Sequence, residues 1–527
     1  MPDLSVGAVD IVVIVVYLIA SRIIPLLFRG KNDDAEGYFL GGRNFIWPLI
    51  GLSLFATNQS GSTFVGLAGA GYNQGISVYS YEWMAVVILV IFIFFLLPFY
   101  LRSEVFTMPE FLEKRYDRRS RLAFSGFNLF ANIFIDTATA LYAGGVVIQA
   151  LFPSVPLWIL VLALALFAGV YTIFGGLGAV MVSDSIQAVV ALVGAAIIGV
   201  LAYQEIPSWQ AVREAAPDGA LNIIQPVGDE TLPWPGLFTG VIIIGLYFWT
   251  TNQLIVQRTL GARSLDHGRW GSVLCGFVKL PALFIMILPG TMAIVLYPNL
   301  QSPDQVFPVL AFDLLPVGLR GVVLAALVAA ITSTVDSILN SASTLVTMDF
   351  VKTFRPQTSE GGLVLSGRIT TAVVMIVAVI WAPQITNFPT LWQYLQSALS
   401  YVTPPVVVVF LGGIFWSRAN GYGAFTTLAV GVPIGALFFV LNEILEVFKI
   451  QFLYASGISL VASCLILAGV SLATPAPPEE KTEELTWRPA LWHEESRELQ
   501  EKPWWQNYRY QSLVLLATTA AIVIWWW

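Results

Sequence analysis

Residues 84–100 read MAVVILVIFIFFLLPFY, an uncharged apolar run about as long as one membrane crossing. Two further runs, at residues 8–28 and 185–203, reach the length of about 18 residues that a membrane-spanning helix needs. Only 11% of the 527 residues are charged and the mean hydropathy is +0.76, whereas about 25% of a soluble protein is charged. This composition excludes a soluble globule, a disordered chain, a disulfide scaffold and a nucleic-acid-binding protein. It predicts an all-α integral membrane protein embedded in a lipid bilayer.

A scan with a window of about 19 residues predicts fourteen membrane-spanning helices. They lie at residues 8–28, 46–72, 77–100, 122–150, 156–174, 184–203, 235–257, 270–297, 319–346, 363–384, 389–415, 421–442, 451–473 and 510–526. Lys and Arg gather in the loops 101–121, 349–368 and 258–269, the last of which begins with Arg258, while the loop 204–234 is acidic. With fourteen spans all basic loops fall on one side, which the positive-inside rule makes cytoplasmic. We therefore expect a multi-pass protein of the plasma (inner) membrane with both termini outside the cytoplasm.

Polar clusters interrupt two of these spans. The second contains ATNQSGST (residues 56–63) and the seventh contains TTNQ (residues 250–253), each inside an apolar run. Backbone groups freed at membrane depth are tolerated only where they line a cavity or meet protein. The two spans lie five apart, so they cross in opposite directions, as do the paired broken helices of inverted-repeat transporters. The alternative is that these small and polar residues only allow close helix packing.

Few ionisable residues lie within the predicted spans: Glu82, Asp136, Asp184, Lys279 and Asp336. Each costs at least about 2.5 kcal/mol at the bilayer centre, which favours a functional role. The structural alternative is that Lys279 neutralises one of the carboxylates.

The ninth span contains ITSTVDSILNSAS (residues 331–343), with hydroxyl and carboxylate oxygens on one side of a helix. Such oxygen ligands suit a hard cation. The alternative is that the hydroxyls bond back to carbonyls of their own helix.

With these motifs the chain resembles the sodium:solute symporter family, and within it the sodium/sugar cotransporters, from about Gly37 to Arg418. The matching stretches are FLGGRNFIWPLIGLSLFATNQSGSTFVGLAGAGY (39–72), YEWM (81–84), YTIFGGLGAVMVSDSIQ (171–187), NQLIVQRTL (252–260), GVVLAALVAAITSTVDSILNSASTLVTMD (321–349) and LWQYLQ (391–396). The resemblance implies a LeuT-type core of two inverted five-helix repeats with broken helices. It divides the chain into an N-terminal extra helix and cytoplasmic loop (1–45), a first repeat (46–203), an extracellular loop (204–234), a second repeat (235–418), two extra helices (419–473), a cytoplasmic loop (474–509) and a C-terminal helix (510–527).

The resemblance also implies sites for sodium. The principal site lies between the broken second helix and the ninth helix. Its ligands would be the backbone carbonyls of Ala56, Gln59 and Ala330 and the hydroxyls of Ser333 and Thr334. Some members bind a second sodium, and the matching positions are Asp184, Ser333, Asp336 and Ser337. Asp336 stands where those members have a small hydroxyl residue. The number of coupled sodium ions, one or two, therefore stays open.

For the substrate, the resemblance implies hydrogen bonds from a sugar ring to Asn58, Glu82, Lys279 and Gln396. Thr63 stands in the same pocket, where the sugar transporters have Gln or His. Tyr247 or Phe248 matches the inner gate, Phe248 being the aligned position, and the outer gate matches Leu67, Tyr81 and Trp392. Gly245 and Ala85 stand where the galactose transporter has Asn and Ser. The identity of the sugar therefore stays unresolved.

We therefore expect sodium-coupled symport of a neutral sugar, a hexose such as galactose or glucose, or a polyol, by alternating access. Sodium is the coupling ion and no cofactor is expected. The sequence has no HExxH, GxSxG or P-loop motif, which argues against an enzyme. Two alternatives stay open: symport of another solute such as sialic acid, whose branch carries an Arg on the fourth helix that residues 122–150 lack, and a non-transporting sensor with a symporter-like domain. The oligomeric state stays open as well.

Overall fold

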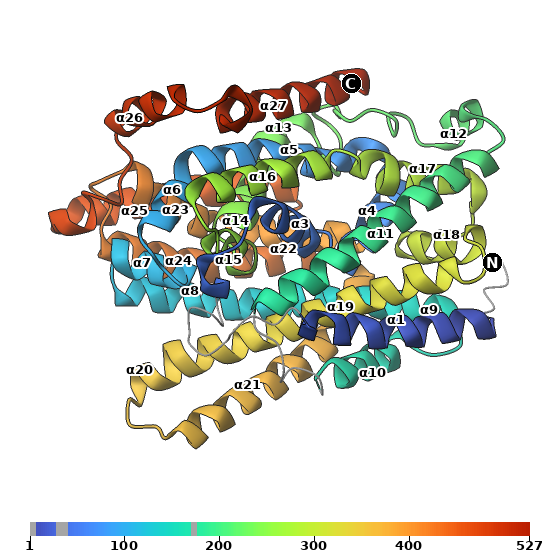
Figure 1. Ribbon diagram of the computed structural model, residues 1–527, viewed down its shortest axis with the longest axis horizontal. Helices are drawn as coiled ribbons and strands as arrows, with labels where there is room; N and C mark the ends of the chain where they lie inside the picture. The colour runs from blue at the N-terminus through green and yellow to red at the C-terminus, as the bar shows by residue number, and fades with distance from the viewer. Residues whose placement is uncertain (1–6, 28–39, 170–176) are drawn as a thin grey trace.

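The computed structural model describes residues 7–27, 40–169 and 177–527, which are helices joined by short connections (Figure 1). Within these ranges there are two isolated β-bridges and no strand. Residues 1–6 and 28–39 of the predicted N-terminal segment lie outside the described residues, as do residues 170–174 at the end of the fifth predicted span.

Helices lie on each of the predicted spans. In chain order they are α1 (Ala8–Leu27), α3 (Trp47–Asn58) with α4 (Gly61–Gln74), α5 (Tyr79–Ile91) with α6 (Leu97–Arg102), α8 (Arg118–Ala131) with α9 (Ala138–Leu151), α10 (Leu157–Gly169), α11 (Leu177–Glu205), α13 (Trp234–Gly236) with α14 (Ile242–Thr250) and α15 (Gln253–Leu260), α16 (Leu265–Lys279) with α17 (Leu288–Leu296), α19 (Leu319–Thr344) with α20 (Lys352–Phe354), α21 (Glu360–Trp381), α22 (Leu391–Val402) with α23 (Pro404–Phe415), α24 (Gly421–Phe439), α25 (Phe452–Ala473) and α27 (Tyr508–Trp525). In the part of the chain that the structure describes, eight continuous helices are long and apolar enough to cross a membrane, or ten if each of two bent pairs is one crossing.

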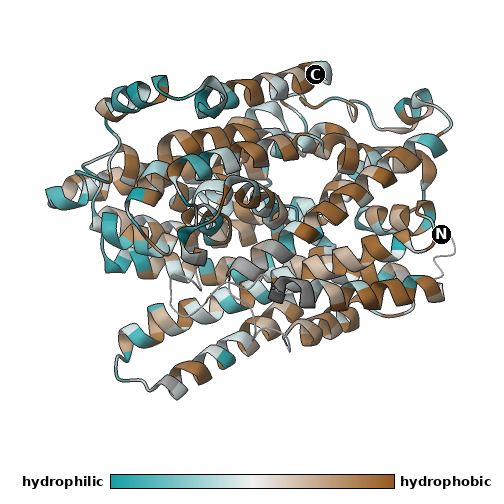
Figure 2. Ribbon diagram, in the orientation of Figure 1, coloured by the Kyte–Doolittle hydropathy of each residue, from teal (hydrophilic) through white to brown (hydrophobic). Residues whose placement is uncertain are grey.

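Shorter helices lie in the connections between these spans. They are α7 (Met108–Arg115), α12 (Trp209–Ala215), α18 (Val306–Leu314) and α26 (Pro489–Gln500). Figure 2 shows hydrophobic residues along most of the long helices, with hydrophilic residues mainly at their ends and in α26. Large apolar side chains point away from the protein on α21 and α25, where Ile380 and Leu465 are each 68% exposed. A lipid surrounding accounts for this exposure, because lipid tails are as apolar as these side chains.

Several helices begin earlier than the apolar pattern predicts because polar caps start them. Ser264 accepts a hydrogen bond from the backbone of His267, so α16 begins at Leu265 rather than residue 270. The Asp117 side chain accepts a hydrogen bond from the backbone N–H of Ser120, so α8 begins at Arg118 rather than residue 122. Capping acts through single side chains, which a hydropathy window averages out.

Both predicted helix interruptions are confirmed. Between α3 and α4, Gln59 leaves the helical region (φ −85°, ψ 59°) and Ser60 is extended. Between α14 and α15 the chain bends by 48°, and the Asn252 side chain accepts from the Leu254 N–H to start α15. The sequence analysis did not predict a third bend, of 53°, between α22 and α23. Its signal is the pair Pro404 and Pro405, which cannot donate hydrogen bonds to the preceding turn.

The start of α4 lies directly against α19. A Cβ atom at Gly61 would collide with Cγ1 of Ile331, so only glycine allows this approach. The same helix α4 packs on α17, and α3 packs on α16 and α11. The break is therefore enclosed by protein on several sides, as a discontinuous helix in a membrane requires.

A buried carboxylate fixes the start of α22. Asp304 lies in the connection between α17 and α19, outside every predicted span, and is only 2% exposed. It accepts hydrogen bonds from the Leu391 N–H at 3.0 Å and from the Tyr142 hydroxyl at 3.0 Å. Burial raises the pKa of Asp304 to about 6, although these two hydrogen bonds oppose the rise.

This pKa predicts a pH dependence of stability. Folded Asp304 binds its proton more tightly than the unfolded chain does, so its contribution to the free energy of unfolding falls as pH rises from about 4 through about 6. The difference from an ordinary carboxyl is equivalent to about 3 kcal/mol. We expect Asp304→Asn, which keeps an acceptor for Leu391, to remove this dependence in thermal denaturation between pH 4 and 7. Asp218→Asn, at an exposed carboxylate in the loop 204–234, is the control; equal pH profiles of wild type and Asp304→Asn would contradict the prediction.

Candidate functional site

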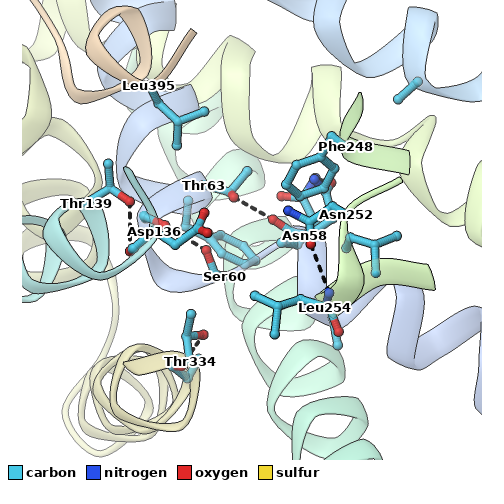
Figure 3. A pocket seen from close by; sticks show the side chains of 18 of the residues that line it. Asn58, Ser60, Thr63, Asp136, Thr139, Phe248, Asn252, Leu254, Thr334 and Leu395 are labelled. Carbon is cyan, nitrogen blue, oxygen red and sulfur yellow. Dashed lines mark hydrogen bonds between the residues drawn. The ribbon is translucent and has the colours of Figure 1, made fainter. Parts of the chain in front are cut away.

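A cavity of about 140 Å³ lies where the two helix breaks meet. Its wall is built by the α3–α4 break, the α14–α15 break and side chains from α5, α9, α11, α16, α19 and α22. Since a water molecule needs roughly 10–15 Å³ of such space, the cavity has room for a small ligand. Figure 3 shows polar side chains from separate helices pointing into it, among them Asn58, Thr63 and Asp136.

A buried ion pair forms one side of the cavity. Nζ of Lys279 lies 2.7 Å from Oε2 of Glu82, and the two side chains are 1% and 3% exposed. Lys279 also donates to Oδ1 of Asn58 and lies 4.9 Å from the centre of the Trp249 ring. The Nε2 group of Gln59 donates to Glu82 at 3.0 Å. Pairing of Lys279 with a carboxylate, the structural alternative in the sequence, is therefore present, and it occurs in the cavity wall.

Among the buried polar atoms of the described cavity residues that have no hydrogen-bond partner are Oε1 of Gln59, Oε1 of Gln396, Nε1 of Trp392 and Nε of Arg258. Buried polar atoms are nearly always hydrogen-bonded in native proteins. Open acceptors and open donors in one cavity are therefore suited to a ligand that both donates and accepts hydrogen bonds.

The structure distinguishes the two residues predicted for the inner gate. Phe248 lines the cavity, whereas Tyr247 lies behind it and packs edge-on against Phe127 at 5.4 Å. The Tyr247 hydroxyl accepts from Nδ2 of Asn252 at 3.3 Å. Tyr247, predicted to bind substrate, therefore supports the α14–α15 break instead of facing the cavity.

Of the predicted outer gate, two members line the cavity and one does not. The Tyr81 and Trp392 rings meet edge-to-face with centroids 5.6 Å apart, and both residues contribute to the wall. Leu67 is fully buried in α4 and does not line the cavity as the structure describes it.

The predicted sodium ligands come together. The five residues of the principal site all line the cavity: Ala56, Gln59, Ala330, Ser333 and Thr334. Thr334 donates to the Ala330 carbonyl at 2.8 Å, so the alternative of a hydroxyl bonded to its own helix holds for this residue. A hydroxyl that donates its proton still has lone pairs for a cation. The two observations are compatible.

The residues of the second predicted sodium site are only partly together. Asp184, Ser333 and Ser337 line the cavity, and Ser333 donates to Oδ1 of Asp184 at 3.2 Å. Asp336, which stands at i+3 from Ser333 on α19, does not line the described cavity.

Arg258 is a charged cavity residue that was not predicted from the sequence. We assigned it to the loop 258–269, but it lies in the last turn of α15, is 3% exposed and lines the cavity. Its guanidinium lies 3.6 Å from Oδ2 of Asp184. The available signal was that Arg258 directly follows the apolar end of the broken seventh span, where Asp184 was without a predicted partner.

Comparison with known proteins was made on this chain. A model of the sodium:solute symporter family matches residues 38–431. Sodium/myo-inositol cotransporter 2 of Bos taurus is 34% identical over 538 residues, which cover 92% of this chain and 80% of that protein. Sodium/glucose cotransporter 4 of Danio rerio is 32% identical and covers 95% of this chain and 84% of that protein.

Two solved structures share the fold. A substrate-bound, outward-open sodium-coupled sialic acid symporter matches with a TM-score of 0.72 at 22% identity, covering 89% of this chain and 99% of that one. A closed, bromovinylhydantoin-bound structure of Mhp1, a nucleobase-cation-symport-1 family transporter, matches with a TM-score of 0.56 at 12% identity, covering 86% and 98%.

The buried Glu82–Lys279 pair should contribute to the free energy of unfolding in a way that paired substitutions can test. Glu82→Gln leaves a buried ammonium without its carboxylate, which we expect to lower the free energy of unfolding by about 3–5 kcal/mol. Combining it with Lys279→Met removes the stranded charge, so the double variant should be more stable than the sum of the two single changes by about 0.5–3 kcal/mol. Thermal unfolding of the purified, substrate-free protein measures this cycle.

The exposed pair Glu446 and Lys449, 4.0 Å apart, provides the control. Neutralising Glu446 should change the unfolding temperature little, because exposed pairs contribute about 0–1 kcal/mol. Strictly additive effects of Glu82→Gln and Lys279→Met would show that the buried pair is not coupled.

Proposed function

We propose that this chain, which belongs to the sodium:solute symporter family, transports a sugar or a polyol. Membership of that family makes it a sodium-coupled solute symporter rather than an enzyme. The observation that carries this proposal is the set of open polar atoms at Gln59, Gln396 and Trp392 in one small cavity. Hydroxyl groups both donate and accept, so a hydroxylated ring can satisfy all three atoms at once. The names of the relatives, sodium/myo-inositol and sodium/glucose cotransporters, point to the same chemistry.

In this proposal the ring hydroxyls lie between Gln396 and the Glu82–Lys279 pair. Asn58 and Glu82 would accept from hydroxyls, while Lys279 would donate one of its three N–H groups. Thr63 offers a hydroxyl from α4, although it now donates to the Asn58 carbonyl at 2.6 Å. Phe248, Tyr81 and Trp392 would cover the faces and edges of the ring, since aromatic rings combine apolar area with a polar rim.

Sodium would bind in the same cavity at the α3–α4 break, held by the carbonyls of Ala56, Gln59 and Ala330 and the hydroxyls of Ser333 and Thr334. These neutral oxygens suit an ion that must leave in every cycle. A second ion at Asp184, Ser333 and Ser337 would have to compete with the Arg258 guanidinium for the same carboxylate. We therefore propose one principal sodium, with the second site depending on displacement of Arg258.

The proposed architecture follows from the paired breaks. With α3–α4 in the second span and α14–α15 in the seventh, the two broken helices occupy equivalent places in two five-helix repeats of opposite orientation. Fourteen spans in the plasma membrane, both termini outside the cytoplasm and the sequence-based domain boundaries complete this proposal. Substrate and ion would lie between the repeats, so rocking of one repeat against the other gives alternating access.

Sialic acid fits this cavity less well. Its carboxylate would meet Glu82 and Asp136, and both cations of the wall already pair with carboxylates. Like charges at short range in a buried site disfavour an anion. The sialic acid symporter therefore supports the fold rather than the substrate.

Sodium-driven uptake tests the proposed function. One charge moving down ~150 mV contributes about 3.5 kcal/mol, and a tenfold sodium gradient adds about 1.4 kcal/mol. One coupled ion can therefore concentrate an uncharged solute several-thousandfold, on the order of 10³–10⁴. We expect radiolabelled myo-inositol or glucose to accumulate in proteoliposomes under an inward sodium gradient, and uptake to collapse when choline replaces sodium. Equal rates in both media for every hexose and polyol of a panel would contradict the proposal.

The sodium ligands can be tested separately. Ser333→Ala removes one proposed ligand, and we expect about a tenfold or greater rise in the sodium concentration for half-maximal uptake, since contacts with charged groups are worth about 1.5–3 kcal/mol. Substrate affinity at saturating sodium should change much less. Thr344→Ala removes an exposed hydroxyl from the same helix α19 and should leave sodium dependence unchanged. An unaltered sodium requirement in Ser333→Ala would remove this residue from the site.

A further inference from the structure

The cavity wall carries an unbalanced negative charge. Three carboxylates, those of Glu82, Asp136 and Asp184, and two cations, Lys279 and Arg258, line it. Glu82 pairs with Lys279 at 2.7 Å and Asp184 pairs with Arg258 at 3.6 Å. Asp136 is left over, and its carboxylate has no hydrogen bond or ion pair with any part of the chain that the structure describes. With all five groups ionised, the described residues that line the cavity therefore carry a formal charge of −1.

Asp136 is held toward the cavity by a widened turn. It lies in the π-helical segment Asn132–Thr137 between α8 and α9, a form of turn that often marks functional sites. The Tyr394 hydroxyl donates to the Phe134 carbonyl at 2.5 Å, and Thr139 donates to the Asp136 carbonyl at 3.1 Å. Figure 3 shows Asp136 beside Thr139 and Ser60 and facing the side of the cavity that holds Thr63 and Asn58. The backbone contacts fix the turn and leave the carboxylate for a ligand.

The open hydrogen-bonding groups of the cavity point to a donor-rich ligand. Oε1 of Gln59, Oε1 of Gln396 and the Asp136 carboxylate accept hydrogen bonds, whereas Nε1 of Trp392 and Nε of Arg258 donate them. Acceptors therefore exceed donors. A hydroxyl brings one donor together with acceptors, whereas a protonated amine brings three donors, no acceptor and a positive charge.

We propose that Asp136 makes the cavity selective for a hydroxylated ring that carries a protonated amino group, an amino sugar or an aminated cyclic polyol. The proposal rests on the sugar or polyol symport proposed above, and it replaces the neutral substrate expected from the sequence. The ammonium group pairs with Asp136 and neutralises the cavity, while the ring hydroxyls bind Glu82, Lys279 and Gln396. A sodium ion at Asp136 beside a neutral ring is the competing arrangement, and the sodium dependence of an Asp136 variant distinguishes the two.

The test is competition between matched ligands in proteoliposomes that contain the full chain. Sodium-driven uptake of radiolabelled glucose or myo-inositol is inhibited with glucose, its 2-amino, 3-amino and 6-amino derivatives, N-acetylglucosamine and an aminated inositol. At least one amine should compete about ten- to a hundredfold better than its neutral parent, the range expected for hydrogen bonds to a charged group. N-acetylation, which removes the charge and keeps the ring, should abolish that preference.

Variants of Asp136 separate this role from a structural one. Asp136→Asn keeps the shape of the side chain and should lose the preference for amines over the neutral parent, and thermal unfolding of the purified variant shows whether it is folded. Asp136→Glu keeps the charge and should restore part of the preference. If Asp136→Asn fails to fold, the competition experiment on the wild type still shows whether the cavity prefers amines to their neutral parents.

Three results would overturn the proposal. One is a wild type that takes up neutral rings and binds no amine better than its parent. Another is an unchanged amine preference in Asp136→Asn, and the third is a lower Hill coefficient for sodium in that variant, which would make Asp136 an ion ligand. Absence of sodium-driven uptake of every ring, neutral or aminated, would instead overturn the sugar or polyol function itself.

Discussion

The break between α3 and α4 is the constraint on which the rest of the structure depends. A helix interrupted at membrane depth frees backbone groups that lipid cannot hydrogen-bond, so protein must surround them. Gly61 allows α19 to lie against the start of α4, where a side chain would collide with Ile331. That approach brings the carbonyl of Ala330 and the hydroxyls of Ser333 and Thr334 to the cavity beside Ala56 and Gln59. Cavity, proposed ion site and helix packing therefore have one common origin.

Electrostatics then shapes this enclosed space. Charges in a low-dielectric interior are tolerated when they pair and hydrogen-bond. The cavity wall contains two such ion pairs, Glu82 with Lys279 and Asp184 with Arg258. Asp136 breaks the pattern, since its backbone is tied down while its carboxylate is not. This carboxylate is the group that we propose to bind the ligand.

The sequence predicted the features that depend on local composition and missed those that depend on packing. Polar clusters inside apolar runs located both helix breaks, and a resemblance to known symporters supplied sodium-ligand positions that do meet at one cavity. Tyr247 and Phe248 could not be told apart from the sequence, because neighbouring helical residues point in different directions and tertiary contacts such as that of Tyr247 with Phe127 fix the rotation of α14. Arg258 was placed in a loop because a hydropathy window ends a span at an arginine. Only the position of Asp184 on another helix makes that arginine a buried one.

The carboxylate of Asp304 gives the protein an external handle on its cavity. It joins the connection between α17 and α19 to the first turn of α22, the helix that carries Trp392 and Gln396 into the cavity wall. Force applied to that connection is therefore transmitted to two cavity residues through a hydrogen bond buried from solvent. A change of side chain at Asp304 would therefore reach two residues of the cavity wall without altering any residue that lines the cavity.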